Sequence, residues 1–365
     1  MNDLPFLLAL SFIPKLGPVS GRSLISYCGG TAEAVFATPK GKLLKVPGIG
    51  EITAEAILEQ ETLTKAEEEI DRCEKLGIQI VPYDHSSYPR ELTYIFDAPL
   101  ILYQKGNINL NAQPNIAIVG TRKPTEQGRD ITVEFAEFFV SHGINVMSGL
   151  AYGIDITAHK TALDMEGMTT AVLGHGLDSI YPTTHARHAF AMQEKGGLLT
   201  EYPLGVKPDP RHFPARNRIV SGICKAVIVI EAAERGGALI TAHQAFEQNR
   251  EVYAVPGRIG DTYSVGCNKL IKNQVAKLLT HPQEVLDDLE IQWEPKDDQQ
   301  LDLALETVLS PEETKVMNYL HKGDAVVDHI SHQTGIPMSQ LNSLLLSMEF
   351  KGLIAQAPGK KFRKR

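Results

Sequence analysis

Residues 115–122 read Asn-Ile-Ala-Ile-Val-Gly-Thr-Arg, an apolar run that ends in glycine, threonine and arginine. A short, continuous apolar run predicts a strand buried on both faces, as in a parallel sheet. Similar runs follow at residues 144–147, 170–173, 197–200, 226–230 and 251–255. Between the first two runs, Ile131, Phe135 and Phe139 recur at helical spacing, and Gly143 follows as a stop. This alternation predicts an α/β fold with a doubly wound, mainly parallel sheet of the Rossmann type.

Short polar or glycine-rich segments follow these runs or open the next helix. They are residues 118–122, 148–155, 174–178, 213–218 and 231–237. In a parallel α/β sheet, loops at these places meet along one edge, where ligands bind. The segments offer glycine amides and arginines, but no obvious nucleophile beside its base. We therefore expect a crevice that binds an anion, and the best candidate is the backbone of a nucleic acid.

The charge of the chain weighs mildly against this hypothesis. The net charge of the 365 residues is −8 at pH 7, whereas nucleic-acid-binding domains are usually basic. Binding depends on local fields, however, and the acid is concentrated in residues 284–306, where nine residues are acidic and only Lys296 is basic. Residues 207–225 contain five lysines or arginines, with Asp209 as the one acid.

The sequence gives no reason to expect a cofactor, a metal or a membrane. The dinucleotide-binding pattern GxGxxG does not follow the first strand, which argues against a nicotinamide or flavin cofactor. The four cysteines are far apart, as in a reduced cytosolic protein without a metal site. No apolar run approaches the ~20 residues that cross a bilayer, and the first residues lack a basic signal-peptide region. We expect a cytoplasmic protein without membrane insertion.

The core defined by these runs, residues 80–290, is flanked on both sides. Residues 1–79 read as helical, and their turns at 13–17 and 46–50 resemble each other, as in helix-hairpin-helix units that contact phosphates or as in a small packing domain. An acidic linker is expected at 291–308. Residues 309–365 predict three helices and a terminal hairpin, the pattern of a winged helix. Its basic end is either a solvated tail or a contact for nucleic acid or acidic protein.

The five core segments, in this order, resemble the DprA/Smf family of bacterial DNA-processing proteins, and the flanking regions extend the resemblance over the whole chain. It implies an extended Rossmann-type core between an N-terminal helical domain and a C-terminal winged helix. It also implies a role without catalysis. Members bind single-stranded DNA that enters the cell in natural transformation, protect it, and load RecA recombinase onto it as single-strand-binding protein is displaced. They generally act as homodimers.

The residues predicted to contact DNA lie mostly in these segments. They are Gly120, Thr121, Arg122, Ser148, Gly149, Gly176, Phe213, Arg216, Asn217, Arg218, Lys225 and Lys269. Arg122 matches the family's DNA-contacting turn and can grip a phosphate with two parallel hydrogen bonds. We favour Arg216 toward DNA, whereas Arg218 is either a second contact or structural. Phe213 is either a stacking platform for bases or part of the core.

Other residues near the strand ends have open or structural roles. Asp155 is expected to cap the helix that follows it. Glu201 and Glu231 either bind a ribose hydroxyl or hold the arginines in place. The chain departs from the family pattern at Tyr152, His185 and Gly236, where a basic residue, an asparagine and a serine are usual; the tyrosine can instead stack on a base.

Two other functions are compatible with parts of the sequence. Phosphoribohydrolases of nucleoside monophosphates share this Rossmann variant, but their phosphate loop is only loosely echoed by residues 235–241, and its following glutamate is missing. A regulator that binds duplex DNA through the winged helix is the other alternative.

Overall fold

The computed structural model describes residues 3–291, 310–320, 323–351, 353–357 and 361–364. The chain divides into two units, Met1–Trp293 and Glu294–Arg365, and each is described by itself. Except for Ile291, the predicted acidic linker lies outside the described residues.

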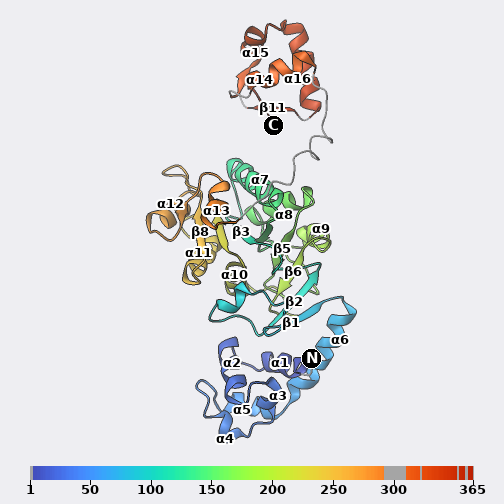
Figure 1. The fold of residues 1–365 in the computed structure, drawn as a ribbon, viewed down its shortest axis with the longest axis vertical. Helices are drawn as coiled ribbons and strands as arrows, with labels where there is room; N and C mark the ends of the chain where they lie inside the picture. The colour runs from blue at the N-terminus through green and yellow to red at the C-terminus, as the bar shows by residue number, and fades with distance from the viewer. Residues whose placement is uncertain (1–2, 292–309, 321–322, 352, 358–360, 365) are drawn as a thin grey trace. The chain divides into compact units, whose positions relative to one another are not determined.

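A nine-stranded sheet forms the centre of the first unit (Figure 1). Its strands are β1 (Gln79–Pro82), β2 (Ile101–Gly106), β3 (Asn115–Val119), β4 (Asn145–Ser148), β5 (Thr169–Val172), β6 (Gly197–Thr200), β7 (Ala226–Val229), β8 (Glu251–Ala254) and β9 (Lys277–Leu278). Their order is β1-β2-β6-β5-β4-β3-β7-β8-β9. All pairs from β6 to β9 are parallel, and β2 pairs antiparallel with both β1 and β6. The predicted doubly wound, mainly parallel sheet is confirmed; β1, β2 and β9 at its edges were not predicted.

The strand order reverses between β3 and β7. From β3 the chain proceeds outward through β4, β5 and β6, then returns to place β7, β8 and β9 on the other side of β3. Loops at the carboxyl ends of β3 and β7 therefore diverge to opposite faces and leave a crevice between them, which is where ligands bind in such sheets.

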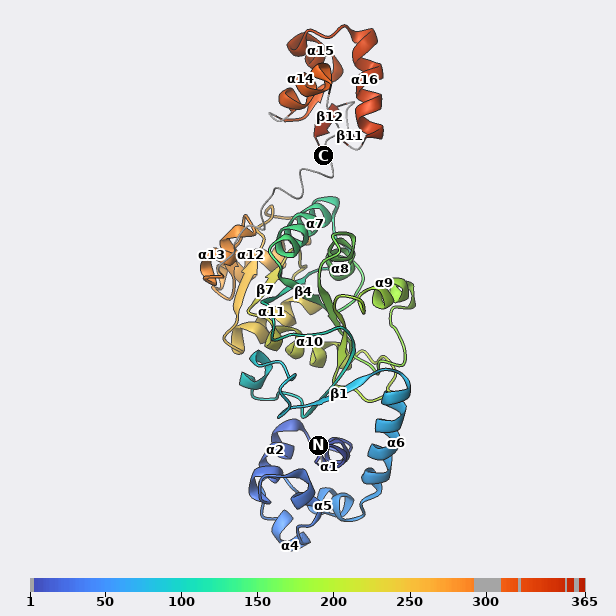
Figure 2. The ribbon, with the colours of Figure 1, turned by 45° about the vertical axis from the view of Figure 1, so that its right-hand side comes forward.

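Alternating residues of the central strands bury their side chains on opposite faces. Ile116 and Ile118 of β3 pack with α7 (Glu126–Ser141) and α8 (Ile154–Asp164), whereas Ala117 and Val119 pack with α10 (His212–Ile223) and α11 (Gly237–Glu247). Both faces of the strand are thus covered, which is why its sequence is continuously apolar. Figures 1 and 2 show α7 and α8 side by side.

The helix α7 ends just before Gly143, as its sequence predicts, whereas its start was not predicted. The Thr125 side chain caps it by accepting a hydrogen bond from the amide of Gly128, and Gly143 follows it with φ +69°. Phe135 and Phe139 lie one turn apart on its buried face, with their rings edge to face at 6.5 Å.

Six helices precede the sheet. They are α1 (Leu4–Ser11), α2 (Pro18–Tyr27), α3 (Ala32–Phe36), α4 (Lys40–Leu43), α5 (Glu51–Leu58) and α6 (Glu61–Lys75). The two similar turns precede α2 and α5, and Lys15 has a φ of 64° where Gly48 has 84°. The lysine thus adopts the left-handed conformation that glycine provides in the second turn.

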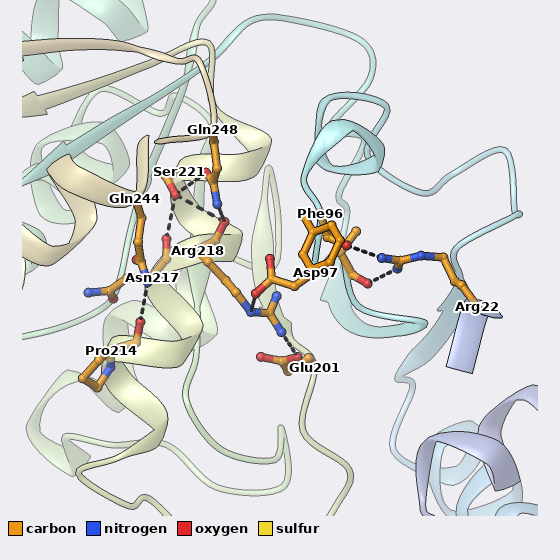
Figure 3. A network of polar contacts seen from close by, with 11 residues as sticks. Arg22, Phe96, Asp97, Glu201, Pro214, Asn217, Arg218, Ser221, Gln244 and Gln248 are labelled. Atoms are coloured by element: carbon orange, nitrogen blue, oxygen red, sulfur yellow. Dashed lines mark hydrogen bonds and ion pairs between the residues drawn. The ribbon is translucent and has the colours of Figure 1, made fainter. Parts of the chain in front are cut away.

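Helices α2 and α6 connect this domain to the sheet. Arg22 of α2 donates to the carbonyl oxygens of Phe96 and Ala98 (Figure 3), and Glu69 of α6 accepts a 2.6 Å hydrogen bond from the amide of Leu204. These bonds hold the helical domain against the loops that support α10.

The second unit is a winged helix, as predicted. It contains α14 (Pro311–Leu320), β10 (Ala325–Val326), α15 (Val327–Thr334), α16 (Met338–Phe350), β11 (Ile354–Ala357) and β12 (Lys361–Lys364). A capping box opens α14: the Ser310 amide donates to Glu313 Oε2 at 2.8 Å, and the Glu313 amide donates to Ser310 Oγ at 3.1 Å. Among the described helices of the chain, none has the length and apolar character needed to span a membrane.

His159 of α8 is a buried titratable group beneath the sheet. Its side chain is 0% exposed, and Nδ1 lies 2.7 Å from Thr169 Oγ1. Burial, with smaller effects of the charges on His185 and Arg216, lowers the pKa of His159 from 6.5 to about 3. The folded protein therefore keeps this imidazole neutral at pH values where the unfolded chain protonates it.

We expect this difference to make stability depend on pH. The contribution of neutral His159 is fully present above pH 6.5 and decreases as the pH falls toward 3, because only the unfolded chain binds the proton in that window. From pH 6.5 to about 5, the extra fall in the free energy of unfolding of the natural protein relative to His159→Gln should steepen from about 0.7 to about 1.4 kcal/mol per pH unit. Urea unfolding at several pH values measures this.

The exposed His243 provides the control. His243→Gln should leave the pH dependence of the natural protein unchanged. Equal pH dependence in His159→Gln and the natural protein would contradict the prediction.

Candidate nucleic-acid interface

A pocket of about 530 Å³ opens at the carboxyl edge of the sheet, where β3 and β7 diverge. Four of the five predicted segments line it, together with Tyr181 and Pro210. The lining residues are Val119, Gly120, Thr121, Arg122, Gly149, Ala151, Asp155, Tyr181, Pro210, Phe213, Pro214, Arg216, Asn217, Val220, Ala232, Ala233, Arg235, Gly236, Gly237, Ala238, Ile240 and Thr241. The turns that carry Arg122 and Arg216 thus lie on one pocket.

The fifth segment, residues 174–178, packs behind the lining. A Cβ atom on Gly174 would lie 3.1 Å from the Phe213 ring, so glycine lets α10 approach closely. Gly176 is also buried: its amide donates to Val206 at 3.0 Å, and a Cβ there would lie 2.5 Å from the Pro203 carbonyl oxygen. The prediction that Gly176 contacts DNA is wrong, because its amide is used within the protein.

The pocket is positively polarised. Its described lining includes Arg122, Arg216 and Arg235 but a single carboxylate, Asp155. Arg122 and Arg235 are exposed, and among the described residues neither guanidinium has a hydrogen-bond or ion-pair partner. Helix α11 also begins in the lining, where its free amides favour an anion. An acidic protein therefore presents a local site for negative charge.

Arg216 lies in the floor of the pocket and is 4% exposed. Its guanidinium donates to the carbonyl oxygens of Gly149 and Val172, and Nε donates to Asn217 at 3.2 Å. Burial lowers the pKa of Arg216 to about 10, opposed by the carboxylate of Asp155, so the group stays charged at neutral pH. Arg216 therefore lines the pocket with its charge, and its Nη2, which has no hydrogen-bond partner among the described residues, is left to donate to an anion.

Asp155 does not cap its helix as predicted. Gly153 is the N-cap of α8, and Asp155 lies in the first turn, where Oδ2 accepts from the amides of Gly149 at 3.1 Å and Ala151 at 3.3 Å. The carboxylate shapes the turn after β4. This bond uses the Gly149 amide within the protein, but Gly149 itself lines the pocket, so its predicted contact with DNA stays a prediction.

Ser148 is fully buried, and its hydroxyl donates to the Ile118 carbonyl oxygen at 2.7 Å. The prediction that Ser148 contacts DNA is wrong, because this last residue of β4 turns its side chain into the sheet. Lys225 is exposed but lies outside the pocket: it precedes β7, at the amino edge of the parallel sheet, whereas the pocket lies at the carboxyl edge, so its predicted DNA contact stays a prediction.

Lys269 of α12 (Val265–Lys272) lies nearer the pocket. Its Nζ is 3.8 Å from Glu234 Oε1, beside the loop that carries Arg235.

The turn after β3 is held by packing and by a backbone hydrogen bond. The Thr121 amide donates to the Glu231 carbonyl oxygen at 2.7 Å, and a Cβ on Gly120 would lie 2.5 Å from Ile154. This packing fixes the turn from which Arg122 projects.

Arg218 faces away from the pocket. Of the two roles that the sequence left open, a DNA contact or a structural one, its contacts fit the structural role. It contacts Asp97 at 3.2 Å and Glu201 at 2.5 Å, as Figure 3 shows. Glu201 is therefore one of the expected arginine-holding carboxylates. Glu231 is not: it accepts hydrogen bonds from the amide and the hydroxyl of Thr125, just before α7.

Asn217 connects α10 to the loop before α11. It accepts from Arg216 and donates to the Gly237 carbonyl oxygen at 3.4 Å. Gly236 in this loop has open space around it, so its lack of a side chain leaves the pocket wall accessible.

An aromatic pair stands in the pocket lining. Phe213 is partly buried and Tyr181 is 48% exposed, with ring centroids 5.8 Å apart and planes tilted by 31°. Their faces suit stacking of bases. Tyr181 and Arg235 were not predicted to contact DNA. Their only signal in the sequence was their position: Arg235 lies within the segment 231–237, and Tyr181 lies shortly after the segment 174–178.

Comparison with known proteins places the chain among DNA-processing proteins. The family model for DNA recombination-mediator protein A matches residues 79–290, and the model for the DprA winged helix domain matches residues 301–360. Protein Smf of Escherichia coli K12 is 40% identical over 290 residues, which are 77% of this chain and 76% of that protein. The DNA processing protein DprA of Streptococcus pneumoniae R6 is 44% identical over 203 residues, 56% and 71% of the two chains.

Two solved structures are also similar. DNA processing protein A from Streptococcus pneumoniae has a TM-score of 0.68 and 32% identity, with 80% of this chain and 98% of that chain covered. A structure of DNA processing protein A from Helicobacter pylori, described for its single-stranded DNA binding mode, has a TM-score of 0.53 and 28% identity, with 59% and 98% covered.

Substitutions can separate a structural role of Arg218 from a role in DNA binding. Arg218→Met should destabilise the protein by about 3 kcal/mol, because it leaves the carboxylate of Glu201 without its partner in a largely buried place. Arg218→Met combined with Glu201→Gln should recover much of that loss. Urea unfolding of the natural protein, both single variants and the double variant measures the coupling.

The affinity for a single-stranded oligonucleotide should change little in the double variant. A stable Arg218→Met protein with strongly weakened binding would instead make Arg218 a DNA contact.

Proposed function

Since this chain belongs to the DNA recombination-mediator protein A family, we propose that it binds single-stranded DNA in the pocket between β3 and β7. It protects DNA that enters the cell in natural transformation and loads RecA recombinase onto it, while single-strand-binding protein is displaced. It acts in the cytoplasm as a homodimer and without catalysis. The observation that carries the proposal is that Arg122 and Arg235, which have no hydrogen-bond or ion-pair partner among the described residues, line one pocket together with the start of α11.

The chemistry of the pocket supports a single strand as its ligand. Arg122, Arg235 and the start of α11 favour phosphate oxygens, while Phe213 and Tyr181 offer faces for bases. Such faces are useful only where bases are unstacked from their neighbours, as in a single strand. A pocket of about 530 Å³ holds a short piece of such a strand but not a base-paired duplex.

The relatives support the wider role. The Helicobacter pylori structure is described for binding single-stranded DNA, and the matched family is named for mediating recombination. Loading of RecA, displacement of single-strand-binding protein and dimer formation rest on the family resemblance.

Neither alternative function gains support from the pocket or the winged helix. Within the described lining, the one carboxylate, Asp155, accepts two amide hydrogen bonds and interacts electrostatically with Arg216, which gives it a structural role rather than one in acid-base chemistry. In the winged helix, residues 338–350 of α16 include no lysine or arginine to contact the phosphates of a duplex.

We expect Arg122→Ala and Arg235→Ala each to weaken binding of a single-stranded oligonucleotide about tenfold at low salt, because each removes a charged hydrogen-bond donor to phosphate. Each substitution should also reduce the slope of log affinity against log salt by about 0.7. Fluorescence anisotropy titrations at several salt concentrations measure both effects.

Arg90→Ala is the matched control, because Arg90 is exposed but absent from the pocket lining. It should leave affinity and slope unchanged. Unchanged affinity and slope in both pocket variants would remove the pocket as the binding site.

The proposed loading activity has a separate test. The natural protein should accelerate assembly of RecA filaments on single-stranded DNA that is coated with single-strand-binding protein, and the Arg122→Ala/Arg235→Ala variant should not. Filament assembly can be followed by RecA ATP hydrolysis. Acceleration by the natural protein and the variant alike would show that loading does not depend on this pocket.

A further inference from the structure

A second exposed surface begins at the rim of the pocket, on α8, η2 (Thr183–His185) and α9 (Ala186–Ala191). Tyr152, next to the lining residue Ala151, is 46% exposed. Its hydroxyl accepts from Thr184 at 3.2 Å, and its ring lies 4.8 Å from that of His185 at 70°. These contacts hold the tyrosine against η2 with much of its ring in solvent.

His185 anchors this arrangement from below. It is buried, and its Nδ1 lies 2.9 Å from the Leu150 carbonyl oxygen. His185, which stands where the family usually has an asparagine, thus supports Tyr152. Tyr152 itself stands where the family often has a basic residue. The aromatic surface is therefore a fixed part of the rim.

Two cations lie beyond this tyrosine. Lys160 of α8 and Arg187 of α9 are exposed, and in the described parts of the chain neither side chain has a hydrogen-bond or ion-pair partner. Both act on His188: burial lowers the pKa of His188 first, and the charges of Lys160, His185 and Arg187 lower it further. The two cations therefore lie near the same imidazole.

The acids near this surface do not cancel its charge. Asp164 of α8 is the neighbouring carboxylate that acts on His188 in the opposite direction. Glu166, which follows α8, is paired with Lys195 at 3.1 Å. Lys160 and Arg187 thus leave a local excess of positive charge.

We propose that Tyr152, Lys160 and Arg187 form a second contact surface for the part of a single DNA strand that leaves the pocket past Tyr181. We call these three residues the α8–α9 surface. The inference rests on the proposed function, because it extends the path of the ligand bound in the pocket.

Continuity of the aromatic groups supports this path. Tyr181 pairs with Phe213 in the pocket and is followed directly by Pro182 and η2, which holds Tyr152. Lys160 lies six residues beyond Ile154, which places it about 9 Å along α8 from the loop at the pocket rim. Aromatic faces followed by cations match the bases and phosphates of a single strand.

A separate cleft near the pocket is less favourable for a polyanion. Helix α7 and residues 255–264 enclose this cleft of about 740 Å³. Its described lining includes Glu126, Glu231 and Asp261, with Arg258 as its cation. Like-charge repulsion disfavours phosphates at such a surface, whereas the α8–α9 surface attracts them.

The length of the oligonucleotide separates the two surfaces. An oligothymidine of about five nucleotides occupies mainly the pocket, whereas one of about twenty extends beyond it. Lys160→Ala/Arg187→Ala should weaken binding of the long strand about tenfold and reduce its salt slope by about 1.4, while the short strand binds as before. Tyr152→Ala should weaken the long strand severalfold with an unchanged salt slope, because it removes stacking but no charge. Anisotropy titrations of the full chain measure these values.

A matched control removes two exposed cations elsewhere, Arg90 and Lys272. Arg90→Ala/Lys272→Ala should bind both strands as the natural protein does. Equal binding of the long strand by the natural protein and by Lys160→Ala/Arg187→Ala would overturn the inference. Equal weakening of both strands would also overturn it, because the variant would then act on the pocket. Failure of the natural protein to bind either strand would instead reject the proposed function.

Discussion

A buried guanidinium holds the candidate site together. Arg216 reaches from α10 to the carbonyl oxygens that follow or end two parallel strands, at Gly149 and Val172, and the carboxylate of Asp155 favours its charge. Asp155 in turn fixes the turn after β4 through two amides. A charge buried this deeply is stable only with such partners, so the strand ends and α10 are held in one arrangement. The shape of the pocket depends on this arrangement.

Helix α10 also links the pocket to the rest of the first unit. While Arg216 faces the strand ends, Arg218 binds Asp97 and Glu201 on the other side of the helix (Figure 3). The loop that carries Asp97 is bound in turn by Arg22 of the helical domain. The helical domain therefore supports the element that forms the pocket floor, although none of its residues appears in the described lining.

The electrostatics reconcile an acidic protein with a polyanionic ligand. The net charge of −8 belongs to the whole chain, but the field at the strand ends is set by Arg122, Arg216, Arg235 and the start of α11. Asp155 offsets only part of this charge. The proposed α8–α9 surface extends the same field along one side of the pocket and away from the acidic cleft beside α7.

Local sequence patterns were enough to predict the parallel strands, the edge where the functional loops meet and the glycine that follows α7. These features depend on continuous apolar runs, helical spacing and a stop residue. Long-range packing, by contrast, set which residues of those loops face the pocket. Ser148 and Gly176 turn inward, Lys225 lies at the far edge, and Tyr181 and Arg235 come to the pocket. Exposure of a side chain depends on neighbours distant in the sequence, so no local pattern could specify it; the same reason hid the edge strands β1, β2 and β9.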